Sequence, residues 1–274
     1  MVSLVNGDAA SVAARVIPFL LEREAENNVM IGFISGAGPL ENVYLRAVEV
    51  DGRLTVAAFH SGLRLLLSQA SMLEGIDGLV TDVSEALPDL PGFGGPQAVC
   101  ERFRELWEER TGTSVNPWMR QCLMVLHEVT PPSWPPGDLR VAAHDDLDLL
   151  APWVAGFIRD TGIPDDVGRA VAGLDQAVAD QRIHLWERAG GPVSMARITG
   201  RTPHGARVSG VYTPPELRGH GYASACVAAL SQRLLDSDMA YCCLYTDLAN
   251  PTSNHIYQAI GYEPVFDVPQ YLCR

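Results

Sequence analysis

Positive charge is scarce in this sequence. The 274 residues carry 20 lysine and arginine side chains against 33 aspartate and glutamate side chains, which gives a formal net charge of −13. Such an excess of acid argues against a general surface for nucleic acid or for anionic membrane lipids. It still permits one local anion site, because a few backbone amides and one or two cations can outweigh distant carboxylates. Neither nucleic acid nor a membrane is therefore expected as a partner.

Cysteine pairs at metal-binding or redox spacing are also missing. None of the cysteines forms a C-x-x-C pair, so neither a zinc site nor a thioredoxin-like motif is supported, and no metal is expected. The adjacent Cys242 and Cys243 lie in an apolar run, where cysteine behaves as a small buried hydrophobe.

Long apolar runs are lacking as well. No run approaches the length that spans a bilayer, and the N-terminus shows no basic segment followed by an apolar one. Apolar residues make up 47% of the chain and charged residues 19%, which is typical of a folded globular protein. We therefore expect a soluble, reduced, cytoplasmic protein.

One change in composition marks a domain boundary. The stretch TPPSWPPGD, residues 130–138, is rich in proline, which removes backbone donors and keeps its predecessors extended. A chain of this length suits two domains. The sequence predicts an N-terminal α/β domain over 1–130, a linker over 131–138 and a C-terminal domain over 139–274.

Periodicity predicts an α/β fold with a mixed sheet. In the first part we expect helix over 8–34 with a break near Pro18, a hairpin turning at Asp51-Gly52, and a helix from Pro96 to Gly112. In the second part, the expected elements are helices over 145–160 and 165–180, a hairpin turning at 190–191, a buried strand over 240–247, a short helix over 250–261 and a final strand over 262–268.

The stretch VYTPPELRGHGYAS, residues 211–224, combines features of an anion site. Pro214 and Pro215 cannot donate to a sheet ladder, so pairing should end there and the strand can splay from its neighbour. Gly219 and Gly221 let successive N–H groups converge on one point, and the following helix adds its positive end. With Arg218 as a fixed charge, the stretch predicts a pyrophosphate cradle.

The cradle matches neither common nucleotide motif. The G-x-x-x-x-G-K-[ST] spacing of a P-loop is absent, and the third glycine of a dinucleotide-binding fingerprint is missing. Taken alone, the stretch is better explained as a strand–turn–helix connection that uses its glycines only for the turn.

Two motifs in order point to a family. Arg218-x-x-Gly221-x-Ala223 resembles the Q/R-x-x-G-x-G/A signature of the Gcn-related N-acetyltransferase (GNAT) superfamily. After a buried strand, ANPTSNHIYQAIGYEPV resembles the closing N-x-x-(S/A)-x-x-x-Y-x-x-x-G-(F/Y) segment of that superfamily. The resemblance covers residues 139–274. The stretches YTPPELRGHGYAS and TDLANPTSNHIYQAIGY are especially similar to a bacterial subgroup of predicted two-domain acetyltransferases.

The resemblance implies a role for each matching residue. The strand end would hold the acetyl-pantetheine arm of acetyl-CoA through the backbone of Val211, Tyr212 and Thr213. The loop would hold the pyrophosphate through Arg218, Gly219, His220, Gly221, Tyr222, Ala223 and Ser224. Asn250 would meet the arm, with Asn254 as a second candidate, and Tyr257 would protonate the departing thiolate.

Each assignment has a structural alternative. Asn250 before Pro251 is also an ordinary helix cap, Tyr257 can be a packed aromatic, and His220 can be a solvated loop residue. The general base is not identified, because Glu216, Asp247, His184 and Glu187 are each more often structural.

The implied activity is transfer of an acetyl group from acetyl-CoA to a primary amine by direct attack in a ternary complex. The acceptor can be a small molecule, a peptide or a protein. One alternative is an amino-acid N-acyltransferase of the glycine-acylating type, and another is a non-catalytic acyl-CoA-binding sensor. The first domain has no second signature, so it is either a degenerate GNAT copy or an unrelated α/β domain that shapes the acceptor site. A homodimer also remains open.

Overall fold

The computed structural model describes residues 1–5, 7–36, 40, 43–163 and 166–274. Contacts between residues divide the chain into two compact units. Unit 1 comprises Met1–Leu123, Thr246–Asn250 and Pro264–Arg274, and unit 2 comprises Met124–Tyr245 and Pro251–Glu263. The final residues, predicted from the sequence as part of the C-terminal domain, thus group with the N-terminal part of the chain. The predicted linker at 131–138 stays a prediction.

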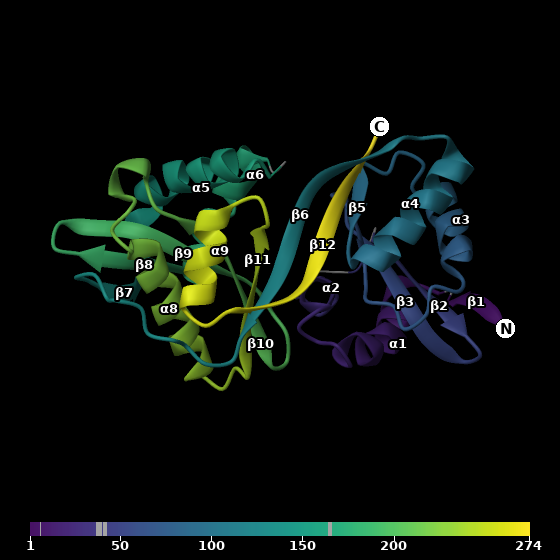
Figure 1. Ribbon diagram of the computed structural model, residues 1–274, viewed down its shortest axis with the longest axis horizontal. Helices are drawn as coiled ribbons and strands as arrows, with labels where there is room; N and C mark the ends of the chain where they lie inside the picture. The colour runs from purple at the N-terminus through teal and green to yellow at the C-terminus, as the bar shows by residue number, and fades with distance from the viewer. Residues whose placement is uncertain (6, 37–39, 41–42, 164–165) are drawn as a thin grey trace. The chain divides into compact units, whose positions relative to one another are not determined.

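Unit 1 is built around a mixed sheet. Its described strands are β1 (Val2–Val5), β2 (Tyr44–Val50), β3 (Arg53–His60), β4 (Leu65–Leu67), β5 (Gly92–Gly94) and β12 (Glu263–Cys273), in the order β1-β2-β3-β4-β5-β12. Within that order β4 and β5 pair in parallel and the other neighbours pair antiparallel. The helices are α1 (Ala9–Leu21), α2 (Asn28–Ile34), α3 (Ile76–Ala86) and α4 (Gln97–Thr111) (Figure 1).

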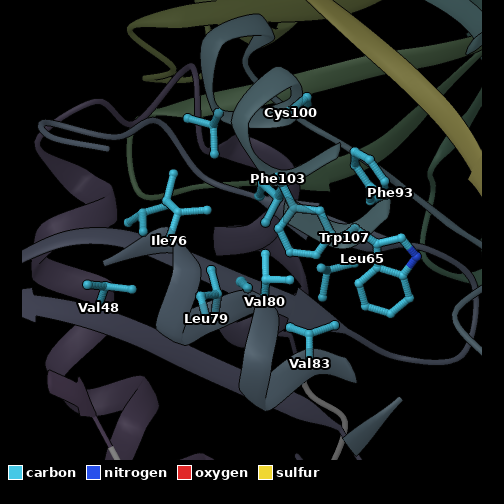
Figure 2. Packing of buried hydrophobic residues seen from close by; sticks show 14 of the residues in the cluster. Val48, Leu65, Ile76, Leu79, Val80, Val83, Phe93, Cys100, Phe103 and Trp107 are labelled. Carbon is cyan, nitrogen blue, oxygen red and sulfur yellow. The ribbon is translucent and has the colours of Figure 1, made fainter. Parts of the chain in front are cut away.

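Helices cover both faces of the unit 1 sheet. Figure 2 shows one core, in which α3 and α4 face the strands. It includes Ile76, Leu79, Val80 and Val83 from α3, Phe103 and Trp107 from α4, and Val48, Leu65 and Phe93 from the sheet. A second core joins α1 and α2 to the opposite face, where Leu45 and Ala47 point. The alternation of inward positions along β2 is the period of two expected of a strand covered on both faces.

Local signals explain several boundaries. Asp51 and Gly52 have φ values of 50° and 81°, as the predicted two-residue hairpin requires. Gly112 closes α4 in the left-handed region, with φ at 69°. In the β5–β12 pair, a Cβ on Gly92 would lie 2.2 Å from the carbonyl oxygen of Tyr271, so only glycine permits this approach.

Unit 2 carries its own mixed sheet. Its strands are β7 (Asp138–Val141), β8 (Ile183–Arg188), β9 (Gly191–Arg201), β10 (Gly205–Tyr212) and β11 (Tyr241–Asp247), in the order β7-β8-β9-β10-β11. The last pair is parallel and the others are antiparallel. The helices are α5 (Leu147–Thr161), α6 (Val167–Ala172), α7 (Leu174–Ala179), α8 (Tyr222–Leu235) and α9 (Pro251–Ala259), with short 3₁₀ turns η1 (His144–Asp146) and η2 (Pro215–Leu217). Strand β6 (Val115–Leu126) begins in unit 1 and ends in unit 2.

The two faces of the unit 2 sheet are also covered. Leu150 and Val154 of α5 and Leu174 of α7 form a core with Ile183 and Leu185 of β8. Helix α8 packs on β8, β9 and β10 with one fully buried face. The sheet therefore forms the middle layer of a three-layer unit (Figure 1).

The units repeat one architecture. In each unit the order along the chain is one strand, helices, three antiparallel strands, a helix, a strand and a helix. The helix that follows the three antiparallel strands, α3 or α8, connects two strands that pair in parallel, β4 with β5 or β10 with β11. The predicted α/β fold with mixed sheet is thus confirmed, and unit 1 has the element order expected of a degenerate copy.

Two sequence expectations differ from the structure. Pro18 lies inside α1, because one lost hydrogen bond is offset by a buried face that includes Val12, Val16 and Leu20, and the helix break comes after Leu21. The helix expected over 165–180 divides into α6 and α7 at Gly173, while Asp165 lies outside the described residues.

Candidate functional site

Strand β10 leaves its parallel neighbour before it ends. The β10–β11 register covers three pairs and ends at Arg207 with Cys243, whereas β10 continues to Tyr212. On the β9 side the register shifts between Ser209 and Tyr212, where Gly210 has a φ of 58°. A Cβ on Gly210 would lie 2.8 Å from the Arg197 side chain, so glycine is needed for both backbone and space. The predicted splay of the strand is confirmed.

Two left-handed glycines form the loop that follows. Gly219 and Gly221 have φ values of 81° and 76°, and Gly221 caps α8 without a side-chain hydrogen bond. A Cβ built on either glycine would meet nothing within 4 Å. Because the first N–H groups of a helix have no intrahelical partner, the start of α8 presents donors beside open space. Ala223 and Ser224, in this first turn, are partly exposed.

Arg218 is engaged within the protein. Its Nε donates to the Thr213 carbonyl oxygen at 2.9 Å, and its Nη2 donates to Asp160 Oδ2 at 2.6 Å. Its guanidinium carbon lies 5.8 Å from the ring centroid of Tyr212. The residue predicted to carry the fixed charge of the cradle therefore connects the loop to the end of β10 and to α5.

Side chains fix the end of β10. Thr213 Oγ1 donates to Ser194 Oγ at 2.9 Å, and Ser194 Oγ donates to the Tyr212 carbonyl oxygen at 3.1 Å. The Tyr212 side chain is buried against Trp153, with 6.3 Å between ring centroids. Tyr212 can therefore contact a ligand only through its backbone. Backbone contacts are also what the sequence predicts for Val211 and Thr213.

A second contact chain supports the loop. His220 Nδ1 lies 2.9 Å from the Arg218 carbonyl oxygen, and its exposed ring stacks on Tyr222 at 5.4 Å between centroids. The Tyr222 hydroxyl accepts from Arg188 Nη1 at 2.7 Å. His220 and Tyr222 therefore stabilise the loop through protein contacts.

Helix α9 carries the remaining predicted residues. The Tyr257 ring lies 6.0 Å from that of Tyr262, at an edge-on angle of 64°. No described residue forms a hydrogen bond with the Tyr257 hydroxyl, and burial raises the pKa of this phenol to about 12. Asn254 lies on the same helix and is partly exposed, and Asn250, directly before the helix, is exposed. These positions neither establish nor remove the predicted contacts to a pantetheine arm.

The four candidates for a general base have other surroundings. Glu187 pairs with Arg140, and Asp247 Oδ1 accepts from the Ala249 N–H at 2.9 Å. Glu216 is exposed in η2. His184 is 4% exposed, and burial, with smaller contributions from two arginines, lowers its pKa to about 4. None of these groups stands out as a base.

His184 should make stability depend on pH. The folded protein resists protonation of this imidazole down to about pH 4, whereas the unfolded chain takes up the proton near pH 6.5. We expect stability to fall between pH 6.5 and 4, by about 3 kcal/mol from this group. Urea unfolding across this range should show a flatter profile for His184→Leu than for wild type. The control His255→Gln, at an exposed position, should keep the wild-type slope, and an unchanged slope in His184→Leu would contradict the assignment.

Unit 1 lacks the corresponding space. Gly75 caps α3 in the same left-handed conformation, with φ at 84°, but its Cβ would lie 2.6 Å from the side chains of Val2 and Val48. A Cβ on Gly95, just after β5, would lie 2.5 Å from the Leu67 carbonyl oxygen at the end of β4. In unit 2 there is open space at the start of α8, and β10 separates from β11. In unit 1, side chains and backbone occupy the corresponding space at the start of α3 and at the ends of β4 and β5.

Three residues of the site were not found from the sequence. Asp160 and Arg188 each contact the loop through one side-chain hydrogen bond, and Ser194 contacts the strand end through two. No motif or spacing marks them, because each contact joins elements that are distant along the chain.

Among the residues that the structure describes, no group of three or more histidine, cysteine, aspartate or glutamate side chains is arranged to hold a metal ion. No helix in the same residues is long and apolar enough to cross a membrane.

Comparisons with known proteins agree with this geometry. Residues 188–269 match the family model of the FR47-like protein, which spans the loop, α8 and α9. No curated protein matches the chain.

Several solved structures share the whole fold. A GCN5-related N-acetyltransferase from Sphaerobacter thermophilus is 14% identical, with a TM-score of 0.67 over 98% of this chain and 94% of its own. A GNAT-family acetyltransferase from Colwellia psychrerythraea is 11% identical, with a TM-score of 0.62 over 100% of both chains. A tandem GNAT protein from the clavulanic acid biosynthesis pathway is 12% identical, with a TM-score of 0.58 over 100% of this chain and 98% of its own. The predicted resemblance is confirmed: residues 188–269 match the FR47-like family model, and the whole chain shares the fold of these GNAT acetyltransferase structures.

Proposed function

We propose that the chain is an acyl-CoA-dependent N-acyltransferase that moves an acetyl group from acetyl-CoA to a primary amine. One observation carries the proposal. Strand β10 separates from β11 after Arg207 and is connected by the short turn η2 to an open loop, with two left-handed glycines, that starts α8. This arrangement would offer an extended backbone edge to a pantetheine arm and N–H donors at the start of α8 to a pyrophosphate.

The residues divide by what they offer to the donor. The backbone of Val211, Tyr212 and Thr213 would hold the acyl-pantetheine arm, and the amides of residues 218–224 would hold the phosphates. Asn250 and Asn254 stay candidates for the arm. The side chains of Arg218 and His220 are directed to protein carbonyl groups, so we assign them to the shape of the loop.

The chemistry needs few side chains. In a ternary complex, the neutral amine attacks the thioester carbonyl carbon, a C–N bond forms, and the C–S bond breaks. A backbone N–H near Val211 would stabilise the developing oxyanion. The departing thiolate needs a proton, and the Tyr257 phenol is available to donate one, since a tyrosine is protonated at neutral pH and burial raises the pKa of this one further, to about 12. The attacking nitrogen becomes positively charged in the tetrahedral intermediate and loses one proton to a base, which leaves the neutral amide product.

The partner is an amine on a small molecule, a peptide or a protein. The filled helix start of unit 1 favours a single donor site per chain, located in unit 2. None of the six cysteines, all of which lie within the described residues, forms a disulfide, which fits the predicted cytoplasmic location. That location and a possible homodimer both stay predictions.

An amine-library screen with detection of released thiol tests the proposal. The chain suits this assay because it contains 20 arginines and no lysine, so the protein offers no lysine side chain as an unintended acceptor. We expect acetyl-CoA to raise the melting temperature and at least one amine, with glycine in the library, to release CoA. Binding without release from any amine would favour a sensor. A melting temperature unchanged by every acyl-CoA would remove the proposal.

A further inference from the structure

We propose that Asp160 is a positioning residue for the donor site, acting through Arg218 to hold the glycine loop in its binding conformation. The inference rests on the proposed acyl-CoA site and extends it to a helix that carries no part of the signature. In this proposal the side chain of Arg218, the arginine of the signature, stabilises the loop and does not bind the phosphates.

Arg218 is held on three sides. Its Nη2 donates to Asp160 Oδ2 at 2.6 Å, its Nε donates to the Thr213 carbonyl oxygen at 2.9 Å, and its guanidinium lies over the Tyr212 ring. Charge-assisted hydrogen bonds of this length are among the stronger ones in proteins. Since the planar guanidinium is oriented by two acceptors at once, the backbone of residue 218 is fixed at the point where the loop begins.

Asp160 is itself on a rigid support. It lies in the last turn of α5, two positions before the left-handed cap Gly162. The same helix packs closely on the strand end, because a Cβ on Gly156 would lie 2.4 Å from the Tyr212 hydroxyl. The hydrogen bond from Arg218 also lowers the pKa of Asp160, so the carboxylate stays ionised at neutral pH. Helix α5, the end of β10 and the loop therefore form one connected frame.

A direct role for Arg218 in phosphate binding makes the opposite prediction. Asp160 is a negative charge near a site for an anion, so its neutralisation should strengthen binding if only Coulomb attraction matters. If Asp160 positions the loop, the same change should weaken binding, because the loop amides lose their fixed orientation.

The test measures the dissociation constant of acetyl-CoA by calorimetry. We expect Asp160→Asn and Arg218→Gln each to weaken binding about tenfold, the scale of one charge-assisted hydrogen bond. The double variant should bind no worse than either single variant, because both remove the same contact. Arg218→Lys should also lose affinity, since lysine keeps the charge but not the planar fork. At saturating donor, kcat should stay near the wild-type value while KM for the donor rises.

The control is Arg159→Gln. Arg159 Nε lies 3.2 Å from the other oxygen of Asp160 and its side chain is 70% exposed, so this change alters the same carboxylate without breaking the contact to Arg218. We expect wild-type affinity within twofold. Melting temperatures measured without ligand identify any variant that is unfolded. If Asp160→Asn or Arg218→Gln is unfolded, the affinity of Arg218→Lys for acetyl-CoA tests the positioning role instead.

The outcomes separate the two proposals. Wild-type binding with unchanged or tighter binding in Asp160→Asn would overturn the positioning role alone. Additive losses in the double variant would also overturn it. Absence of acyl-CoA binding in wild type would overturn the proposed function and this inference with it.

Discussion

Gly221→Glu is expected to abolish acyl-CoA binding, with a loss of at least about 100-fold, or roughly 2.7 kcal/mol. The substitution adds a carboxylate at the residue that caps α8, where an anionic ligand would bind. The position is open, since a Cβ there meets nothing within 4 Å, so the new side chain fills the space that the phosphates need. The positive φ of 76° adds strain of about 1 kcal/mol, which the fold should tolerate.

The matched control for this prediction is Gly112→Glu in unit 1. Gly112 is also left-handed, with φ at 69°, and a Cβ there also meets nothing within 4 Å. It therefore experiences the same strain and the same added charge, at the C-terminal end of α4. Calorimetry and thermal shift with acetyl-CoA should show wild-type affinity for Gly112→Glu and no response for Gly221→Glu. Similar affinities in the two variants would place the donor site elsewhere.

Much of this site could be predicted because its signals are local. Pro214 and Pro215 end a strand by their lack of N–H groups, and the glycines at 219 and 221 permit positive φ regardless of the rest of the fold. The same holds for the Asp51-Gly52 hairpin and the Gly112 cap. Such features depend on a few consecutive residues, so one sequence is enough to find them.

Contacts between distant segments could not be predicted in this way. Asp160 and Arg218 are 58 positions apart, and Thr213 and Ser194 are 19 apart on different strands. Their meeting depends on how α5 and β9 pack against β10, and no periodicity records that packing. The pairing of β12 with β5 is another case, because apolar alternation predicts a strand but does not name its partner.

The assignment of Arg218 shows how the two levels combine. The motif includes Arg218, for which the sequence predicts a contact to phosphate. Its acceptors, the Thr213 carbonyl and Asp160, are both protein groups. The presence of an arginine at position 218 can be read from the local sequence. Its role depends on Asp160, which comes close to it only in the folded protein.

Tyr257→Phe is expected to lower kcat about 100-fold while the affinity for acetyl-CoA stays within twofold of wild type. The ring, with its contact to Tyr262, is retained, and the variant lacks only a hydroxyl that makes no hydrogen bond to any described residue. If that hydroxyl protonates the departing thiolate, its removal slows C–S cleavage without changing how the donor binds. Single-turnover kinetics should isolate this step from product release.

Tyr262→Phe provides the comparison that makes the result specific. Its hydroxyl is buried and lies 2.8 Å from Ser231 Oγ, so the variant should lose stability but keep kcat. The raised pKa adds a second test, because a phenol with a pKa of about 12 remains protonated throughout the working range. The rate of the wild-type enzyme should therefore show no loss from this group as pH rises to 10. A normal single-turnover rate in Tyr257→Phe would exclude the tyrosine as the acid and would leave protonation of the thiolate to solvent.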